Sequence, residues 1–326
     1  MSNVQELGER GVIERLARLV PTAPAVIEGI GDDCAVVRIC ERVMLLSCDL
    51  FIEDVHFRRA YASPYDIGWK SAVASMSDIA AMGGTPLFSL VSLALPPDTE
   101  VDFVDELYRG LSAALSRFGA VIVGGDTTTS LNGVALDVTV IGDAPGERYV
   151  RRTGAQAGDV LAVTGHLGLS AATLHALENG HEISTSISQR YFSPAPRIRE
   201  GQWLGNCPSV HAMIDLSDGL ISDANRLAEG ALLGVDIESR AVPVLPGLTE
   251  YCEEQGFDPM ACCLGGGEDY ELAIVLDCDS SGHAIHSFHH EFRTTFTRVG
   301  RFTDEWQGVR IDGKEPSFSG YDHFKQ

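Results

Sequence analysis

The 326-residue sequence predicts a mixed α/β protein with two domains. Three observations lead to this prediction. The chain is long enough for two domains of ordinary size, its 44% hydrophobic and 21% charged residues are typical of a folded protein, and short apolar strand patterns alternate with helical patterns. A stretch rich in Gly, Pro and Arg at 143–158 has no periodicity and separates the two halves. We therefore expect domains over residues 1–145 and 146–326.

The first half alternates strands and helices. Strands are expected over 35–39, 43–48, 87–95, 120–123 and 134–141. A helix should begin at Pro64, because Ser63 supplies an N-cap and proline suits a first turn, and Gly83 should end it. A second helix is expected over 101–118.

The second half continues this alternation. We expect strands over 160–164, 211–214 and 270–276, and helices after Gly168 and over 196–204, 220–231 and 280–292. The sequence has no short repeat and no low-complexity tract, so each half is expected to form an ordinary α/β domain.

The charge and the apolar pattern exclude several partners. The chain has 24 Lys plus Arg against 46 Asp plus Glu, a net charge of −22, which would repel bare nucleic acid and anionic membranes. The longest apolar stretch, 87–95, is about half of what a membrane span needs, and the N-terminus has no signal-peptide pattern. The eight cysteines form no CxxC pair, which suits reduced thiols. We expect a cytoplasmic protein.

Carboxylates recur beside glycines or just after apolar strands. Four acidic turns are expected, with the acids Asp32 and Asp33, Asp49, Asp126, and Asp215 and Asp218. Asp78 is expected near the C-terminus of its helix, where an acid opposes the macrodipole. Each turn alone fits an ordinary turn or N-cap. Because two carboxylates about 4 Å apart repel by about 4 kcal/mol, converging acids would need cations, and oxygen ligands favour Mg²⁺ or Mn²⁺.

Other common motifs are absent from the sequence. It contains no Walker A sequence and no GxGxxG between a strand and a helix, so standard P-loop and Rossmann sites are not expected. It also lacks GxSxG and HExxH. The histidines at 283, 286, 289 and 290 fit a solvated helix face better than a metal site. His56 differs from them because it follows an acidic turn.

Taken together, the motifs resemble the thiamine-monophosphate kinase family. Its superfamily also holds aminoimidazole ribonucleotide synthetase, selenophosphate synthetase and the hydrogenase-maturation dehydratase. The matching stretches are GIGDDCAVV (29–37), SCDLFIEDVHF (47–57), KSAVASMSDIAAMGGTP (70–86), GGDTTTS (124–130), RTGAQAGDVLAVTGHLG (152–168), SPAPRIREG (193–201), IDLSDGLISD (214–223), LGGGEDYEL (264–272) and GYDHF (320–324). They follow the family's order.

The resemblance implies a two-domain fold like that of aminoimidazole ribonucleotide synthetase. ATP and several Mg²⁺ ions would bind near the interface between the domains, and ATP would phosphorylate thiamine monophosphate to thiamine diphosphate. The N-terminal domain would form a homodimer through its sheet. The strand 87–95 is expected to contribute to that contact because it is apolar on both faces.

The resemblance also implies site residues. The metal ligands would be Asp33, Ser47, Cys48, Asp49, Asp78, Asp126, Asp215 and Asp218. ATP would be bound by Tyr108, Gly125, Asp126, Arg152 and Ser217, and the substrate by His56, Glu268 and Tyr321. Catalysis would depend on Asp33, Asp49, Asp126 and Arg152. The family commonly has Thr where this chain has Cys48, so ligation through its backbone or its side chain stays open.

The implied chemistry agrees with the residue pattern. Phosphoryl transfer depends mainly on positioning and charge neutralisation, and a phosphate acceptor is already ionised, so no general base is required. Two alternatives remain. One is another ATP-dependent enzyme of the superfamily, although the chain has no cysteine before Cys34 and ends without a cysteine tail. The other is a non-catalytic module that binds cations or nucleotides.

Overall fold

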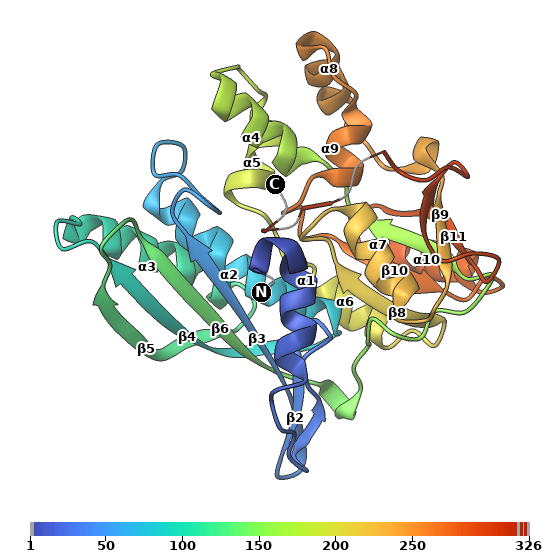
Figure 1. Ribbon diagram of the computed structural model, residues 1–326, viewed down its shortest axis with the longest axis horizontal. Helices are drawn as coiled ribbons and strands as arrows, with labels where there is room; N and C mark the ends of the chain where they lie inside the picture. Colours follow the sequence, from blue (N-terminus) through green and yellow to red (C-terminus); the bar gives the residue numbers. More distant parts are fainter. Residues whose placement is uncertain (1–2, 318–319, 322, 325–326) are drawn as a thin grey trace.

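The protein forms two six-stranded sheets, each with helices packed against it (Figure 1). The structure is a computed structural model that describes residues 3–317, 320–321 and 323–324. One sheet lies in each half of the chain, which confirms the predicted mixed α/β architecture of two domains.

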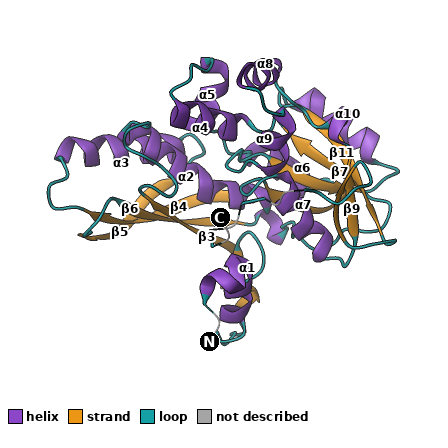
Figure 2. Cartoon of the chain, turned by 45° about the horizontal axis from the view of Figure 1, so that its top comes forward, coloured by secondary structure: helices purple, strands orange, loops and turns teal. Residues whose placement is uncertain are grey.

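The N-terminal sheet has the strand order β1-β2-β3-β6-β4-β5. Its strands are β1 Val26–Glu28, β2 Ala35–Ile39, β3 Arg42–Ile52, β4 Thr85–Leu95, β5 Val121–Thr129 and β6 Ala135–Asp143. Helix α1 is Val4–Ala17, α2 is Pro64–Ala81 and α3 is Val101–Ser116. As predicted, α2 begins at Pro64, and the Ser63 side chain caps it by accepting a hydrogen bond from the Asp66 amide. Figure 2 shows α2 and α3 on one face of this sheet.

The other face of the N-terminal sheet is exposed in the single chain. Along β4 the side chains alternate between buried and exposed, and Phe88 and Leu90 keep 44% and 39% of their surface. The large apolar side chains of Leu50 on β3 and Val121 on β5 are also exposed. The sequence predicted a strand that is apolar on both faces, and the exposed Phe88 and Leu90 agree with it. Their face stays open within one chain, because helices cover only one face of the sheet. The outer face is therefore an apolar surface.

The predicted acidic turns at Asp49 and Asp126 are wrong. Asp49 lies inside β3, which continues to Ile52, and Asp126 lies inside β5, which continues to Thr129. Both strands extend past the acid because apolar residues or threonines follow it, and these residue types suit a pleated strand.

The C-terminal sheet has the order β12-β9-β11-β7-β10-β8. Its strands are β7 Val160–Thr164, β8 Val210–Asp215, β9 Gly234–Ile237, β10 Leu272–Leu276, β11 Phe296–Thr303 and β12 Gly308–Ile311. The helices of this half are α4 Leu169–Asn179, α5 Thr185–Phe192, α6 Ile198–Gly205, α7 Leu220–Glu229, α8 Pro246–Gln255, α9 Pro259–Gly265 and α10 Ser281–Glu291, with short 3₁₀ turns at Pro145–Glu147 and Ser239–Ala241. Across the described residues, every helix is too short or too polar to span a bilayer.

The two faces of the C-terminal sheet enter different cores. Leu161 and Val163 of β7 pack into a core made of C-terminal residues alone. Their neighbours Val160 and Ala162 face the opposite way and join a core with α2 and the N-terminal sheet. Because α2 also contacts β3, α6 and β8, it lies between the two halves. Residues on α2 are thus placed where both sheets can contribute to one site.

Candidate active site

Acidic side chains from both halves converge beside α2. The carboxylates of Asp33, Asp78 and Asp215 offer oxygens that all lie within 4.8 Å of one another. Asp33 precedes β2, Asp78 lies on α2, and Asp215 ends β8. Asp78, whose position near the helix C-terminus was unfavourable for an acid, thus faces two carboxylates from other elements.

Strand β3 adds two more oxygen-bearing side chains on its inner face. Ser47 and Asp49 lie on the same side of the strand because side chains alternate with a period of two. The Ser47 hydroxyl donates a hydrogen bond to Asp78. Cys48 lies on the opposite side, where its thiol donates to Asp137 Oδ2 over 2.8 Å. Its side chain is therefore apart from the acids, and only its backbone carbonyl could join them.

Burial makes the negative charges of this group costly. It raises the pKa of Asp49 to about 6 and that of Asp215 to about 7. The pKa of Asp78 lies well above its usual range, because of burial first and the charges of Asp49, Asp215 and Asp33 second. The carboxylates thus repel one another in a site where water screens little of the repulsion.

Two carboxylate oxygens in this group have no hydrogen-bond partner. Asp33 Oδ2 and Asp49 Oδ2 are buried, and among the described residues neither accepts a hydrogen bond. Buried polar atoms of this kind normally have a partner, so these two need an explanation. A divalent cation would supply the missing contacts, and an oxygen-only donor set fits Mg²⁺. The residues present therefore fit the metal that the sequence implied.

Two arginines neutralise part of the acidic group. Arg152 lies between the two halves, and its Nε and Nη2 donate to Asp33 Oδ1 over 3.1 and 2.6 Å. Arg226 of α7 pairs with Asp218 and also with Asp223, in the latter case over 2.8 Å. Arg152 was predicted from the sequence, whereas Arg226 was not. A signal was present, because Arg226 follows Asp223 by three residues and such residues share one helix face.

Asp126 is not brought to these acids within one chain. It pairs with Ser92 of β4, which pairs with Asp137 of β6, which in turn pairs with Leu50 of β3. Cross-strand partners share a face, so Asp126 lies on the outer face of the sheet. Three strand spacings separate it from β3, a distance of about 14 Å along the sheet.

The other residues expected at ATP take different positions. Gly125 has a φ of 155°, and a Cβ there would lie 1.8 Å from the Val91 carbonyl oxygen, so only glycine fits. Tyr108 lies on α3, partly buried against the shared core. Ser217 lies between Asp215 and Asp218, and its carbonyl accepts a hydrogen bond from the Glu268 amide over 2.8 Å.

The structure places two expected substrate residues near one histidine. The ring centroid of His323 lies 5.0 Å from that of His56 and 4.9 Å from that of Tyr321. The Tyr321 amide also donates to the Asp218 carbonyl over 3.1 Å, which ties this segment to the acidic group. Burial lowers the pKa of His56. Asp322 of the predicted GYDHF motif lies outside the described residues.

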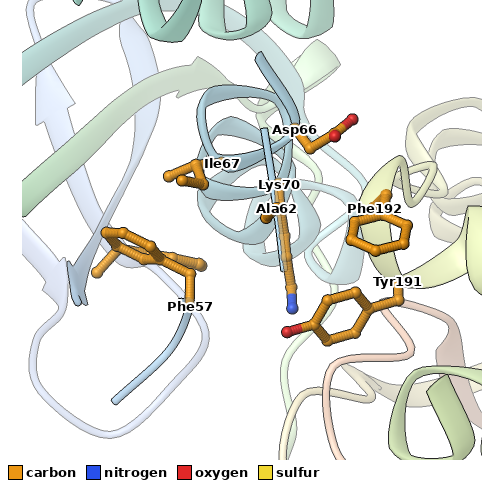
Figure 3. A pocket seen from close by; sticks show the side chains of 8 residues that line it. Phe57, Ala62, Asp66, Ile67, Lys70, Tyr191 and Phe192 are labelled. Atoms are coloured by element: carbon orange, nitrogen blue, oxygen red, sulfur yellow. The ribbon is translucent and has the colours of Figure 1, made fainter. Parts of the chain in front are cut away.

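Glu268, the third expected substrate residue, borders an aromatic pocket. The pocket encloses only about 10 Å³, room for roughly one water molecule, and opens to solvent. It is lined by Phe51, Phe57, Ala62, Asp66, Ile67, Lys70, Tyr191 and Phe192. In Figure 3 the Lys70 ammonium points to the Tyr191 ring, and the two are 3.9 Å apart. Lys70 Nζ also donates to Glu268 Oε2 over 2.6 Å. This pocket was not predicted from the sequence.

The pocket lies next to the acidic group because two elements run through both. On β3, Phe51 follows Asp49 by two residues on the same face, about 7 Å along the strand. On α2, Lys70 precedes Asp78 by eight residues, about 12 Å along the helix. The acidic group thus adjoins a pocket lined by aromatic side chains.

Comparisons with known proteins agree with this geometry. Family models match both halves: AIR synthase related protein, N-terminal domain, over residues 31–144, and AIR synthase related protein, C-terminal domain, over residues 156–312. They do not test the limits of 1–145 and 146–326, which stay a prediction.

Relatives match over nearly the whole chain. The thiamine-monophosphate kinase of Aquifex aeolicus is 34% identical and covers 98% of this chain and 99% of its own. That of Bacillus subtilis is 36% identical over 91% of this chain and 93% of its own. A solved structure described as "AaThiL complexed with AMPPCP and TMP" is 34% identical, covers 99% of both chains and has a TM-score of 0.87. The chain therefore belongs to the thiamine-monophosphate kinase family, as its motifs predicted.

Proposed function

We propose that this protein transfers the γ-phosphoryl group of ATP to thiamine monophosphate and so forms thiamine diphosphate. The family relationship supports this activity, and a similar structure was solved with an ATP analogue and TMP. The observation that carries the proposal is the junction of two features. A buried acidic group with two unpartnered oxygens adjoins an aromatic pocket that borders Glu268.

The acidic group would hold several Mg²⁺ ions. The proposed ligands in this group are Asp33, Ser47, Asp49, Asp78, Asp215 and Asp218, with Cys48 acting through its backbone carbonyl. Asp126, on the outer face of the sheet, would bind a further ion away from this group. Bound Mg²⁺ would neutralise the phosphates of both substrates, which otherwise repel this chain and one another. The donor chemistry supports this assignment, because the side chains offer oxygen ligands only.

The rings of the substrate would bind at this pocket, whose side chains would move apart to admit them. Thiamine has a pyrimidine ring and a cationic thiazolium ring, and aromatic walls such as Phe51, Phe57 and Tyr191 attract both. Lys70 is the one cation among the described lining residues, and Glu268 neutralises it, so Asp66 leaves the pocket with a net negative charge. That charge suits a cationic ring. His56 and Tyr321 would contact the substrate from the neighbouring segment.

The transfer would be direct. The acceptor is an ionised phosphate oxygen, so no side chain needs to remove a proton from it. Arg152 would position a phosphate of ATP with its planar guanidinium, and Tyr108, Gly125 and Ser217 would contact the rest of the nucleotide. Through the cations they bind, the aspartates would align the γ-phosphate of ATP with the phosphate of thiamine monophosphate.

The exposed outer face of the N-terminal sheet would form a homodimer contact. Leu50, Phe88, Leu90 and Val121 give it an apolar surface, which favours burial against a second copy. Because Asp126 lies on this face, its proposed metal and ATP contacts are expected to form across the dimer. Light scattering should report about twice the 35.0 kDa of one chain, and a monomer at micromolar concentration would contradict the contact.

A turnover assay tests the reaction. The protein is incubated with MgATP and thiamine monophosphate, and thiamine diphosphate is measured by chromatography. Unphosphorylated thiamine is the matched control and should not be phosphorylated at a comparable rate. Label from γ-labelled ATP alone should not stay on the protein, because no phosphoenzyme is expected. The cytoplasmic location stays a prediction, which the free cysteines among the described residues support.

A further inference from the structure

Arg226 faces the acidic group but has no role in the function proposed above. It lies on α7, with its side chain 31% exposed, and it uses two nitrogens on two carboxylates. Nη1 donates to Asp223 Oδ1 over 2.8 Å, and Nη2 pairs with Asp218. Its charge also interacts electrostatically with Asp33 and Arg152, so Arg226 belongs to the same group of charged side chains.

The two aspartates that pair with Arg226 differ in burial and in their availability to a cation. Asp223 is fully buried, and its other oxygen accepts from the Asp218 amide over 3.2 Å, so it anchors both the arginine and the loop. Asp218 is a proposed metal ligand and is more exposed. A cation that binds the Asp218 carboxylate competes with Nη2 for the same oxygens. Nη2 then needs a new acceptor, since a largely enclosed guanidinium N–H is rarely left unpaired.

Arg152 shows the same arrangement on the other side of the acidic group. Its guanidinium is held by Asp33, which is also a proposed metal ligand. Each of the two arginines is thus paired with an aspartate that is also a proposed metal ligand. Phosphate is the acceptor that suits a freed guanidinium, because its oxygens match the planar fork of N–H donors.

We propose that Arg226 is a second phosphate-binding arginine, which exchanges Asp218 for a phosphate of the nucleotide when a cation binds Asp218. Asp223 keeps the arginine in place during this exchange. The inference rests on the proposed function for the position of the nucleotide. It adds a residue that the family motifs of this sequence did not indicate.

The test measures two affinities by titration calorimetry on the full chain. One is for Mn²⁺ alone, and the other is for the non-hydrolysable analogue AMPPCP at saturating Mn²⁺. In Arg226→Gln, Mn²⁺ should bind about tenfold more tightly, because a competing positive charge is gone. AMPPCP should bind about tenfold more weakly, because a charged hydrogen bond to phosphate is lost.

Two further variants isolate the effect. Arg38→Gln removes an exposed arginine of β2 that pairs with Glu147 rather than with the acidic group, and should change neither affinity. Arg226→Lys keeps the charge but not the fork, so Mn²⁺ affinity should match the native protein while AMPPCP affinity falls between native and Arg226→Gln.

The opposite pattern overturns the inference. If Arg226 only anchors the loop, Arg226→Gln should weaken both affinities together and lower the melting temperature of the metal-free protein. Unchanged AMPPCP affinity in Arg226→Gln would also overturn it. The proposed reaction is judged separately: a native protein that binds both ligands as expected but makes no thiamine diphosphate would refute the reaction and leave the role of Arg226 intact.

Discussion

The acidic group and the aromatic pocket are neighbours, yet the chain completes only one of them. In the pocket, Lys70 is paired with Glu268 and covered by Tyr191, so its charge is compensated by the protein itself. In the acidic group, Asp33 and Asp49 keep buried oxygens without a partner among the described residues. The charges of the pocket are therefore balanced by the protein itself, whereas the acidic group keeps a repulsion that bound cations or protons relieve.

Replacing one acid should have the largest effect. Asp49→Asn removes a proposed ligand, so we expect kcat/KM to fall about a thousandfold, in line with the several kcal/mol that metal ions supply to phosphoryl transfer. The metal-free variant should be as stable as the native protein or more stable, because one repelling charge is gone.

Activity and thermal unfolding with and without MgATP check this together. MgATP should raise the melting temperature of the native protein and raise that of Asp49→Asn much less. Asp98→Asn, an exposed acid on the loop before α3, is the control and should behave like the native protein. A variant that is destabilised but still active would refute a metal role for Asp49.

The stability of the metal-free protein should rise as the pH falls. Asp49 and Asp215 have pKa values of about 6 and about 7 in the folded protein, against an ordinary value of 3.8. The folded state therefore binds more protons than the unfolded state between about pH 4 and pH 7. The stabilisation is complete below the unfolded pKa and is lost as the pH rises through the folded pKa.

Denaturant unfolding in EDTA at a series of pH values measures this effect. The free energy of unfolding should be larger at pH 5 than at pH 8, by on the order of 3 kcal/mol. Saturating Mg²⁺ should flatten the dependence, since cations replace the protons. Stability that falls steadily from pH 8 to pH 5 would contradict the stored repulsion.

The pocket should respond in a substrate-specific way. Lys70→Met leaves Glu268 without its partner, so KM for thiamine monophosphate should rise about tenfold, because a hydrogen bond to a charged group is worth about 1.5 to 3 kcal/mol. KM for ATP should stay within about twofold, since Lys70 is about 12 Å from Asp78 along α2. Steady-state kinetics with each substrate varied in turn check this, and Lys314→Met on the exposed C-terminal segment is the control. An equal rise in both KM values would show a general loss of structure.

The smallest effect is expected at Cys48. Its thiol lies on the outer face of β3, bonded to Asp137, so Cys48→Thr should keep both turnover and Mn²⁺ affinity within about twofold. Turnover and calorimetric titration with Mn²⁺ measure this. A tenfold loss of Mn²⁺ affinity would mean that the side chain, rather than the backbone, reaches the cations.

Much of the acidic group could be predicted because its signals are local. Asp78 stood out because an acid is unfavourable near a helix C-terminus. Asp49 was identified as an acid of the site but assigned to a turn, since the sequence does not reveal that β3 continues to Ile52. Short elements with weak periodicity, such as β9 and α9, were missed for the same reason: the tertiary contacts that define them are not local.

The pocket was missed because no local pattern describes it. Lys70 and Tyr191 lie 121 positions apart by their numbers, and only the packing of α2 against α5 brings them together. A lysine on a helix is ordinarily an exposed residue, so its burial cannot be read from its neighbours. Arg226 was missed although its spacing from Asp223 was visible, because that spacing also describes a simple surface ion pair.

The shared core has a consequence for how this protein can be divided. Leu272 and Ile274 of β10 pack in the same cluster as Ile79 of α2, so either half expressed alone would expose apolar surface that the other now covers. Thermal unfolding should therefore occur in one cooperative transition rather than two. For the same reason, fragments and chimaeras cut between the halves should aggregate unless the new partner covers the same apolar surface. Substitutions in this shared core on one half should therefore be constrained by the residues of the other half.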